Sequence, residues 1–314
     1  MMSAEIALVI PWFGRFPSSM PLWLNSCRYN QEFDFLLFTD DQSPLDFPSN
    51  VKPVYMTFPE FRALVQKAFP FPISLERPYK CCDFRPAYGE ILSEYLKNYR
   101  FWGHCDLDVI FGNLSHYVTD ALLSEHDRLY SSGHFTLYRN TSEVNSWYKT
   151  LDPLGCMNWK TVFTSSENCA FDEYAEWHGG GMSEIIRRNG KRFYDSVDFA
   201  DIHANISSFK VRSQKECNVP ELYFCFENGT LTARSYGRVL REEMYVHFSQ
   251  RKITVPSGID PDHFFLTAPD LIVSKESEAM KKHPSSLLRY TLDYQGKRVK
   301  RKLSKLFHIA EQRS

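Results

Sequence analysis

The sequence has no long hydrophobic run, almost no net charge and no regular spacing of its cysteines. Its longest apolar stretches, at 6–11 and 33–38, have the length of strands and are too short to cross a membrane. The formal net charge of −1 disfavours a nucleic-acid-binding protein, because such proteins present a strongly basic surface. The eight cysteines include no Cys-x-x-Cys pair, and no basic and apolar leader opens the chain. We therefore expect reduced thiols, no structural zinc and a cytoplasmic location.

The residues that are present predict a globular α/β protein. Hydrophobic residues make up 43% of the chain and aromatic residues 15%, which is enough for a large core. Unbroken apolar runs predict strands buried on both faces, and apolar residues at helical spacing predict helices between them. The expected strands are 6–11, 33–39, 51–56, a strand that runs into a loop over 99–111, 129–138, a hairpin over 223–233 with its turn at Asn228 and Gly229, and a last strand at 245–248. The expected helices are 21–27, 60–69, 83–99, 143–151 and 182–189.

The order of these elements predicts the architecture. Alternating strands and helices are typical of a mostly parallel central sheet that is flanked by helices. The sequence contains no internal repeat, low-complexity tract or flexible linker. We therefore expect one domain over 1–283 and a distinct basic tail over 284–314.

Asp106 and Asp108 form the most informative motif, at the end of an aromatic strand. On extended chain, residues two apart point to the same side and lie about 6.6 Å from each other. Two carboxylates beside apolar side chains are costly to bury unless a cation compensates them. The motif therefore predicts a divalent ion at the carboxyl edge of the sheet, where open α/β folds bind ligands. The alternative is a pair of solvated loop aspartates, or one aspartate that caps the next turn.

Asp106-Leu-Asp108 resembles the Asp-x-Asp motif of nucleotide-sugar glycosyltransferases with the GT-A fold. Two longer segments sharpen this resemblance: Pro-Tyr-Lys-Cys-Cys-Asp-Phe-Arg-Pro-Ala-Tyr-Gly at 78–89 and Phe-Trp-Gly-His-Cys-Asp-Leu-Asp-Val-Ile-Phe-Gly at 101–112. Together they are similar to a bacterial family of polysaccharide glycosyltransferases from capsule and O-antigen gene clusters. The similarity covers most of residues 5–250, and the joint motif is far more specific than Asp-x-Asp alone.

The resemblance implies a GT-A-like, Rossmann-like fold with a donor half over about 1–128 and an acceptor half over about 129–283. It implies that Asp108 ligates Mn²⁺ or Mg²⁺, while Asp106 ligates the ion through water or contacts the ribose. The ion would neutralise the diphosphate and stabilise the leaving nucleotide. The donor would be a nucleotide sugar, with a UDP-hexose as the first expectation, and the acceptor a saccharide or a lipid-linked saccharide.

Several residues are candidates for contacts with the nucleotide. Lys80, Asp83 and Arg85 open a predicted helix just before the motif, although Asp83 alone is also explained as a helix cap. The other candidates follow the first two strands, where such sheets hold nucleotides, or lie near the end of the domain. They are Pro11, Phe13, which could stack near the base, Asp40, and Lys252, which with Arg251 could contact the diphosphate.

His247 is the third candidate metal ligand, because many metal-dependent GT-A enzymes bring a late histidine back to the ion. A single histidine on a strand is more often a core residue whose hydrogen bonds are satisfied, so this reading stays open. The base that deprotonates the acceptor hydroxyl is expected among Asp172, Glu173 and Glu176, with Glu173 as first choice. The alternative is that these carboxylates only open a helix.

The segment 297–305 carries six cations, and apolar residues recur around it at helical spacing. Such a basic amphipathic helix would bind an anionic membrane surface, which suits an enzyme with a lipid-linked acceptor. A solvated charged tail is the alternative. Nucleic-acid binding is disfavoured, because no partner motif accompanies the tail.

The sequence thus predicts a metal-dependent hexosyltransferase that extends a cell-surface polysaccharide at the inner face of the cytoplasmic membrane. Two other classes remain open. One is a non-catalytic scaffold of the same fold that binds sugars or nucleotides. The other is a sugar nucleotidyltransferase, although the segment after the first strand, Pro-Trp-Phe-Gly at 11–14, is a poor match to its glycine- and lysine-rich phosphate loop.

Overall fold

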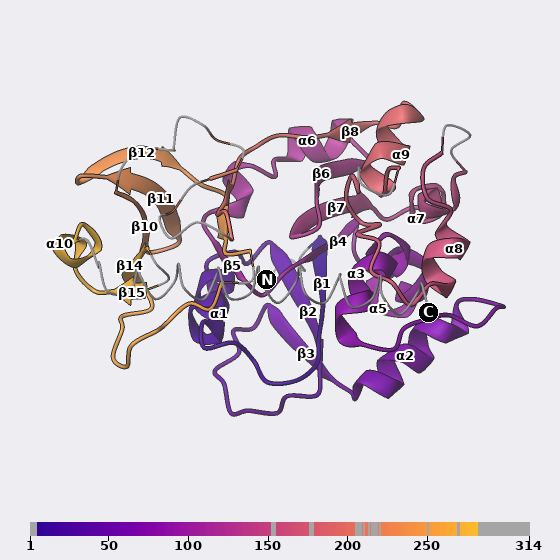
Figure 1. The fold of residues 1–314 in the computed structure, drawn as a ribbon, viewed down its shortest axis with the longest axis horizontal. Helices are drawn as coiled ribbons and strands as arrows, with labels where there is room; N and C mark the ends of the chain where they lie inside the picture. The colour runs from indigo at the N-terminus through magenta and orange to yellow at the C-terminus, as the bar shows by residue number, and fades with distance from the viewer. Residues whose placement is uncertain are drawn as a thin grey trace, which may run out of the picture.

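A computed structural model describes residues 5–151, 155–175, 179–204, 209, 211–212, 214, 219, 221–249, 251–268 and 271–281. A central sheet with helices on both faces forms one part of the molecule, and a smaller antiparallel sheet lies at one end (Figure 1). The expected α/β fold with a mostly parallel, helix-flanked sheet is confirmed. The basic tail expected over 284–314, with the segment 297–305 that we expect to bind a membrane, lies outside the described residues. Among the helices that are described, none has the length and apolar character needed to span a membrane.

The central sheet has seven strands in the order β3-β2-β1-β4-β7-β6-β8. Neighbouring strands are parallel from β3 to β4 and between β6 and β8, and antiparallel from β4 through β7 to β6. The strands are β1 (Ile6–Trp12), β2 (Phe33–Thr39), β3 (Val51–Tyr55), β4 (Phe101–Cys105), β6 (Arg128–Ser132), β7 (Phe135–Arg139) and β8 (Phe193–Tyr194).

Strands β1 and β2 show why continuous apolar runs predict buried strands. Successive side chains of a strand point to opposite faces, so both faces must be covered if all of them are buried. Ala7 and Val9 enter the core on one face of the sheet. Leu8 and Ile10 enter the core on the other face.

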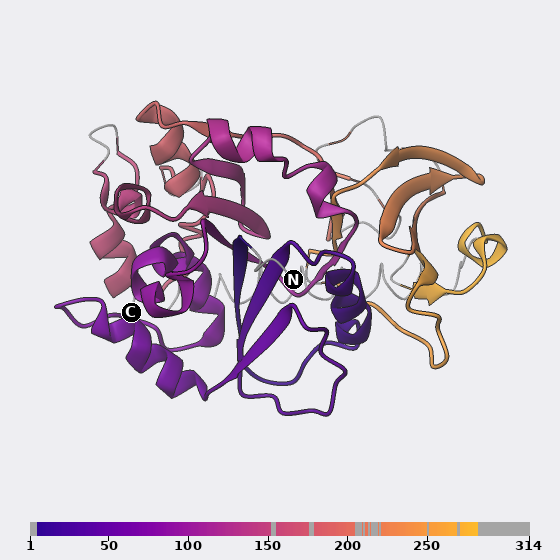
Figure 2. The same cartoon turned by 180° about the vertical axis from the view of Figure 1, so that it is seen from behind.

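The helices cover these two faces, as Figures 1 and 2 show from opposite sides. One face packs against α1 (Met20–Arg28) and α6 (Asp120–Glu125). The other face carries α2 (Phe58–Lys67), α3 (Cys81–Phe84), α4 (Tyr88–Ile91), α5 (Ser93–Leu96), α7 (Ser142–Asn145), α8 (Trp159–Thr164) and α9 (Met182–Arg188). Helix α2 begins with a capping box, in which Thr57 and Glu60 each bond the other's backbone N–H.

Two further sheets follow. A three-stranded sheet joins β5 (Val109–Phe111), β13 (Tyr245–His247) and β9 (Ala200–Asp201) in that order. A five-stranded sheet has the order β12-β11-β10-β14-β15, and α10 (Glu276–Ala279) packs against it. Its strands are β10 (Leu222–Glu227), β11 (Thr230–Ser235), β12 (Arg238–Glu242), β14 (His263–Thr267) and β15 (Leu271–Val273).

The hairpin predicted over 223–233 is confirmed as β10 and β11. Its turn residues Asn228 and Gly229 have φ values of 48° and 86°, the left-handed region that Asn and Gly tolerate best. Strand β13 is not the last strand, because β14 and β15 follow it.

Three predicted elements are wrong in their continuity. The strand expected over 129–138 is an antiparallel hairpin of β6 and β7, which turns between Ser132 and Phe135. The helix expected over 83–99 is broken into α3, a 3₁₀ turn at Arg85–Ala87, α4 and α5, because Pro86 lacks the N–H that a continuous helix needs. The helix expected over 143–151 is the short α7 followed by a 3₁₀ turn at Trp147–Lys149.

Candidate functional site

The candidate site begins at one edge of the central sheet. Strands β1, β2 and β4 are parallel, so their carboxyl ends meet at this edge. Asp106 directly follows β4, and its carboxylate is partly exposed. Asp40 directly follows β2, and its Oδ1 accepts a 2.7 Å hydrogen bond from the N–H of Gly14. This edge is where open α/β sheets bind ligands.

The three-stranded sheet brings later parts of the chain to Asp108. Strand β5 begins directly after Asp108, and the Phe248 N–H donates to the Asp108 carbonyl at 2.8 Å. Strand β13 runs parallel to β9, with His247 opposite Asp201. His247 therefore lies between two carboxylates. Its Nε2 is 3.5 Å from Asp108 Oδ1, and its Nδ1 is 2.8 Å from Asp201 Oδ1.

Asp106, Asp108 and His247 could together hold a metal ion. One ligand atom from each of the three residues lies within 4.8 Å of the others. Two carboxylates and an imidazole are a donor set that suits a divalent cation with mixed oxygen and nitrogen ligands. The sequence pattern predicted these three residues, and the structure brings them together.

The charges around His247 favour a cation at this position. Burial lowers the pKa of His247, but the bonds to Asp108 and Asp201 outweigh it and raise the pKa to about 10. Burial raises the pKa of Asp201, yet its bond to His247 and nearby positive charge bring it down to about 2. Burial raises the pKa of Asp106, against the charge of Arg85. The two aspartates beside His247 therefore stabilise its protonated imidazole, and a metal ion that binds Nε2 must displace that proton.

Arg85 joins the metal motif to a distant segment. Its guanidinium donates through Nη2 to Asp106, and through Nη1 to Asp172 Oδ2 and the Gly133 carbonyl, both at 2.8 Å. The carboxylate of Asp172 is buried, and burial raises its pKa to about 7 against the charge of Arg85. Asp106 and Asp172 are thereby held on either side of one cation.

Glu173 lies beside this ion pair. Its Oε1 accepts a 3.0 Å bond from the N–H of Gly133, in the turn between β6 and β7. Burial raises the pKa of Glu173, against this bond, and the charge of Asp106 raises it further. A Cβ on Gly133 would lie 2.5 Å from Glu173 Oε1 and 2.8 Å from Asp172 Oδ2, so a larger residue there would force these carboxylates to move.

Lys80 and Asp83 are not part of this site. Their side chains are 1% and 0% exposed, and Lys80 Nζ donates to Asp83 Oδ2 at 2.7 Å. Lys80 also donates to the carbonyls of Val162 and Glu167. Asp83 accepts from two further backbone N–H groups, at 169 and 171. These contacts give both residues a structural role in anchoring the segment before Asp172.

The structure places the remaining candidates as follows. Pro11 lies within β1, and Phe13 packs with ring centroids 5.3 Å from Phe58 and 5.5 Å from Phe61. Lys252 is exposed. Glu176 lies outside the described residues.

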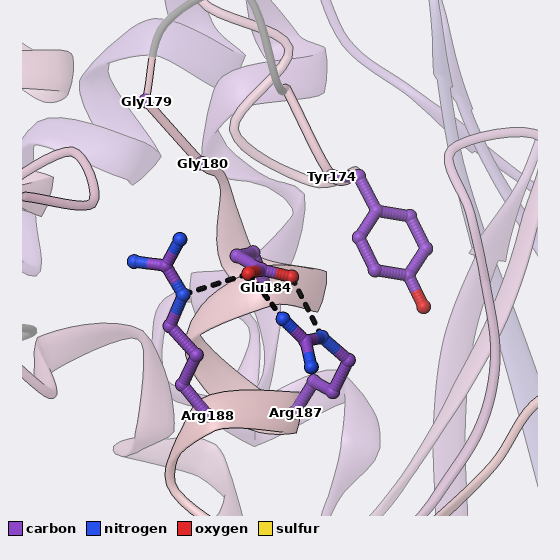
Figure 3. A pocket seen from close by; sticks show the side chains of 6 residues that line it. All are labelled: Tyr174, Gly179, Gly180, Glu184, Arg187 and Arg188. Atoms are coloured by element: carbon purple, nitrogen blue, oxygen red, sulfur yellow. Dashed lines mark hydrogen bonds and ion pairs between the residues drawn. The ribbon is translucent and has the colours of Figure 1, made fainter. Parts of the chain in front are cut away.

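A pocket of about 370 Å³ opens beside the Glu173 segment (Figure 3). Glu184 accepts hydrogen bonds from Arg187 at 2.8 and 2.5 Å and from Arg188 at 2.7 Å, which lower its pKa to about 2. The pocket is lined by these three residues and by Tyr174, Gly179 and Gly180. Tyr174 follows Glu173 in the chain, but the Glu173 carboxylate is bonded to the Gly133 N–H and does not line the pocket.

Sequence reasoning missed four residues of the site. Gly133 and His134 lie in a turn that the sequence did not reveal. Asp201 contacts His247 through strand pairing, and Ser249 Oγ, just after β13, lies 3.4 Å from His247 Nδ1. The rings of His134 and His247 stack with centroids 4.1 Å apart. A histidine or aspartate next to a short apolar run was the only signal available for His134 and Asp201, and such runs are common. Gly133 and Ser249 offered no signal.

The fold and the site define a mixed α/β protein with a candidate divalent-metal centre at the edge of its main sheet. The chain belongs to DUF6625, a family of unknown function whose model matches residues 8–276. A search of curated proteins found no match. Among solved structures, the chain is similar to the apo form of mouse xyloside xylosyltransferase 1, with 9% identity, 80% of this chain and 99% of that chain covered, and a TM-score of 0.37. A likeness at this level assigns neither fold nor activity.

Proposed function

We propose that the protein is a metal-dependent glycosyltransferase of the GT-A type, which moves a hexose from a nucleotide sugar to a saccharide acceptor. The observation that carries this proposal is the convergence of Asp106, Asp108 and His247. They meet at the sheet edge where open α/β folds bind ligands. The Asp-x-Asp resemblance of this segment supports the same assignment.

The donor side uses Asp106, Asp108 and His247 to hold the ion. When bound, a divalent ion would neutralise the donor diphosphate and act as a Lewis acid for the leaving nucleotide. Carboxylates suit both Mg²⁺ and Mn²⁺, whereas an imidazole ligand favours a transition metal. We therefore propose Mn²⁺ before Mg²⁺. Asp40 and Phe13, at the same edge, are candidates for the ribose and the base, and exposed Lys252 for the diphosphate.

The acceptor side uses Glu173 as the general base. A base must be ionised when the acceptor arrives, and a raised pKa makes its carboxylate a stronger proton acceptor. Asp172 is a weaker candidate, because its Oδ2 is held by Arg85 at 2.8 Å. Arg85 orients Asp106 and Asp172, and the pocket beside Tyr174 offers room for the acceptor.

The cellular role that we propose is the extension of a capsule or O-antigen polysaccharide on a lipid-linked acceptor. Its support is the sequence resemblance and the six cations within 297–305. Such a segment would bring a cytoplasmic enzyme to the anionic inner face of the membrane.

A panel of nucleotide sugars, each with Mn²⁺, Mg²⁺ or a chelator, tests the reaction class. We expect one UDP-hexose to stabilise the protein against heat only with metal, and to be hydrolysed or transferred. Stabilisation should grow with free donor by mass action, by about 2.7 kcal/mol at a hundredfold excess over Kd. Metal-dependent binding without turnover would favour the scaffold. Consumption of a nucleoside triphosphate with a sugar phosphate would favour the nucleotidyltransferase.

A further inference from the structure

We propose that Asp201 is a positioning residue, which orients the imidazole of His247 so that its Nε2 faces Asp108 and the metal. This inference rests on the proposed metal site. It adds a residue that neither the Asp-x-Asp motif nor the late histidine indicates.

The pairing of β9 with β13 sets the position of Asp201. The two strands are parallel, and Asp201 is the direct partner of His247 in their register. Side chains of paired residues project from the same face of a sheet and lie close together. The distance of 2.8 Å between Asp201 Oδ1 and His247 Nδ1 is that of a hydrogen bond.

This hydrogen bond selects the tautomer of His247. A neutral imidazole carries its proton on one ring nitrogen and a lone pair on the other. A carboxylate accepts but does not donate, so Nδ1 must carry the proton. Once a metal ion has displaced the proton of Nε2, this nitrogen presents its lone pair on the side of Asp108. Metal-bound histidines commonly have such an outer carboxylate, which fixes the ring and makes it more basic.

Asp201 is itself held in place. Its side chain is buried, and Ser249 Oγ donates to the same Oδ1 at 2.8 Å. The other oxygen lies 3.4 Å from Arg212 Nε. The N–H of Ile202 donates to the His247 carbonyl at 3.0 Å, which fixes the two backbones relative to each other. The carboxylate therefore cannot turn away from the ring without losing several contacts.

His134 restrains the ring in the remaining direction. It stacks on His247 with an interplanar angle of 27°, and its own Nδ1 is 2.9 Å from the hydroxyl of Tyr245. Stacking restrains the plane of the His247 ring, and Asp201 restrains rotation within that plane. Together they direct Nε2 toward Asp108 before any ion binds.

Direct Mn²⁺ binding, measured on the full chain by electron paramagnetic resonance of the free ion, tests this role without donor or turnover. Asp201→Asn keeps the size of the side chain, but its amide can also donate to Nδ1 and favour the wrong tautomer. We expect the Kd for Mn²⁺ to rise about 10- to 100-fold, the usual effect of losing an outer-shell partner. Ser249→Ala, which retains the carboxylate, should raise it less than Asp201→Asn.

Asp198→Asn is the matched control. Asp198 precedes β9 and accepts from Tyr130 and Ser196, so it belongs to the same segment without touching His247. Its Mn²⁺ affinity should equal that of the wild type. The ¹⁵N shifts of His247 should show both ring nitrogens protonated in the apo wild type at neutral pH, because the pKa of this ring is raised to about 10. With diamagnetic Mg²⁺ bound, they should show a proton on Nδ1 alone in the wild type and a shifted balance in Asp201→Asn.

The outcomes separate this inference from the proposed function. If Asp201→Asn folds and binds Mn²⁺ as tightly as the wild type, the positioning role is overturned while the enzyme proposal stands. If it binds weakly but the wild type transfers no sugar, the positioning role stands and the proposed function falls. Absence of Mn²⁺ binding in the wild type would overturn both.

Discussion

Two charged clusters lie almost side by side in the sequence and differ in what they can do. Lys80 and Asp83 form a pair in which the three donors of the ammonium group are matched by three acceptors. Arg85 lies two residues further on and holds Asp106 and Asp172. The first cluster is sealed from solvent, whereas Asp106 in the second is 29% exposed.

The difference teaches that charge balance, rather than residue type, distinguishes a structural pair from a binding site. Around Arg85 and His247, the described residues include five carboxylates: Asp106, Asp108, Asp172, Glu173 and Asp201. In the described part of the chain, the positive groups that contact them are the guanidinium groups of Arg85 and Arg212 and the protonated imidazole of His247, three charges against five carboxylates. A surplus of negative charge in a partly exposed site favours a bound cation.

The largest effect is expected from Asp108→Asn, which removes charge from the open cluster. The affinity for Mn²⁺ should fall by more than about a hundredfold, because loss of a ligand exceeds the 10- to 100-fold cost of losing an outer partner. Sugar transfer should fall to background, with the unfolding midpoint near that of the wild type. Calorimetric Mn²⁺ titration and a transfer assay measure this. Full metal-dependent activity in the variant would refute the metal site.

Lys80→Met should have the opposite effects: a loss of stability with unchanged Mn²⁺ affinity. The substitution removes the cation of the buried Lys80–Asp83 pair. It leaves Asp83 buried without its cation, which typically costs about 3–5 kcal/mol of unfolding free energy. Urea denaturation measures this loss. In the protein that remains folded, Mn²⁺ affinity should be unchanged. Weaker Mn²⁺ binding by folded Lys80→Met would show that the Lys80 pair supports the metal site, so the distinction between the two clusters would be wrong.

Gly133→Ala tests the connection from Arg85 to the candidate base. The added Cβ would lie 2.5 Å from Glu173 Oε1, so the carboxylate must move. Overpacking of this kind costs about 1–3 kcal/mol. We expect a lower kcat with nearly unchanged Mn²⁺ affinity, because no metal ligand is displaced. An unchanged kcat would show that Glu173 is not the general base.

Arg62→Ala should have the smallest effect on stability and on metal affinity, and it serves as the reference for the other variants. Arg62 pairs with Glu76 at 2.8 Å, but the two side chains are 43% and 60% exposed. Exposed pairs contribute about 0–1 kcal/mol, so stability should hardly change, and metal affinity should not change at all. A larger loss of stability in urea would show that exposure alone does not weaken ion pairs in this protein.

The sequence predicted what depends on local pattern. The apolar runs of β1 and β2 and the turn at Asn228 are each determined by neighbouring residues, and the structure has them where expected. Asp106 and Asp108 could be singled out because the two carboxylates follow an aromatic strand two residues apart. His247 could be singled out because the glycosyltransferase resemblance implies a late histidine ligand. Asp201 could not, because its role arises only when β9 pairs with β13. Likewise, the contacts that seal Lys80 come from residues far along the chain.

Strand β13 also determines when the site can exist during synthesis. Chains emerge from the ribosome with the N-terminal part first, so Asp106 and Asp108 are present long before His247. Until β13 inserts between β5 and β9, the motif lacks its imidazole and the strand that holds it. We therefore expect nascent chains that end before Tyr245 to bind Mn²⁺ poorly, as fragments released by truncation would show. Metal affinity then reports that the chain has been made as far as β13 and that this strand has paired.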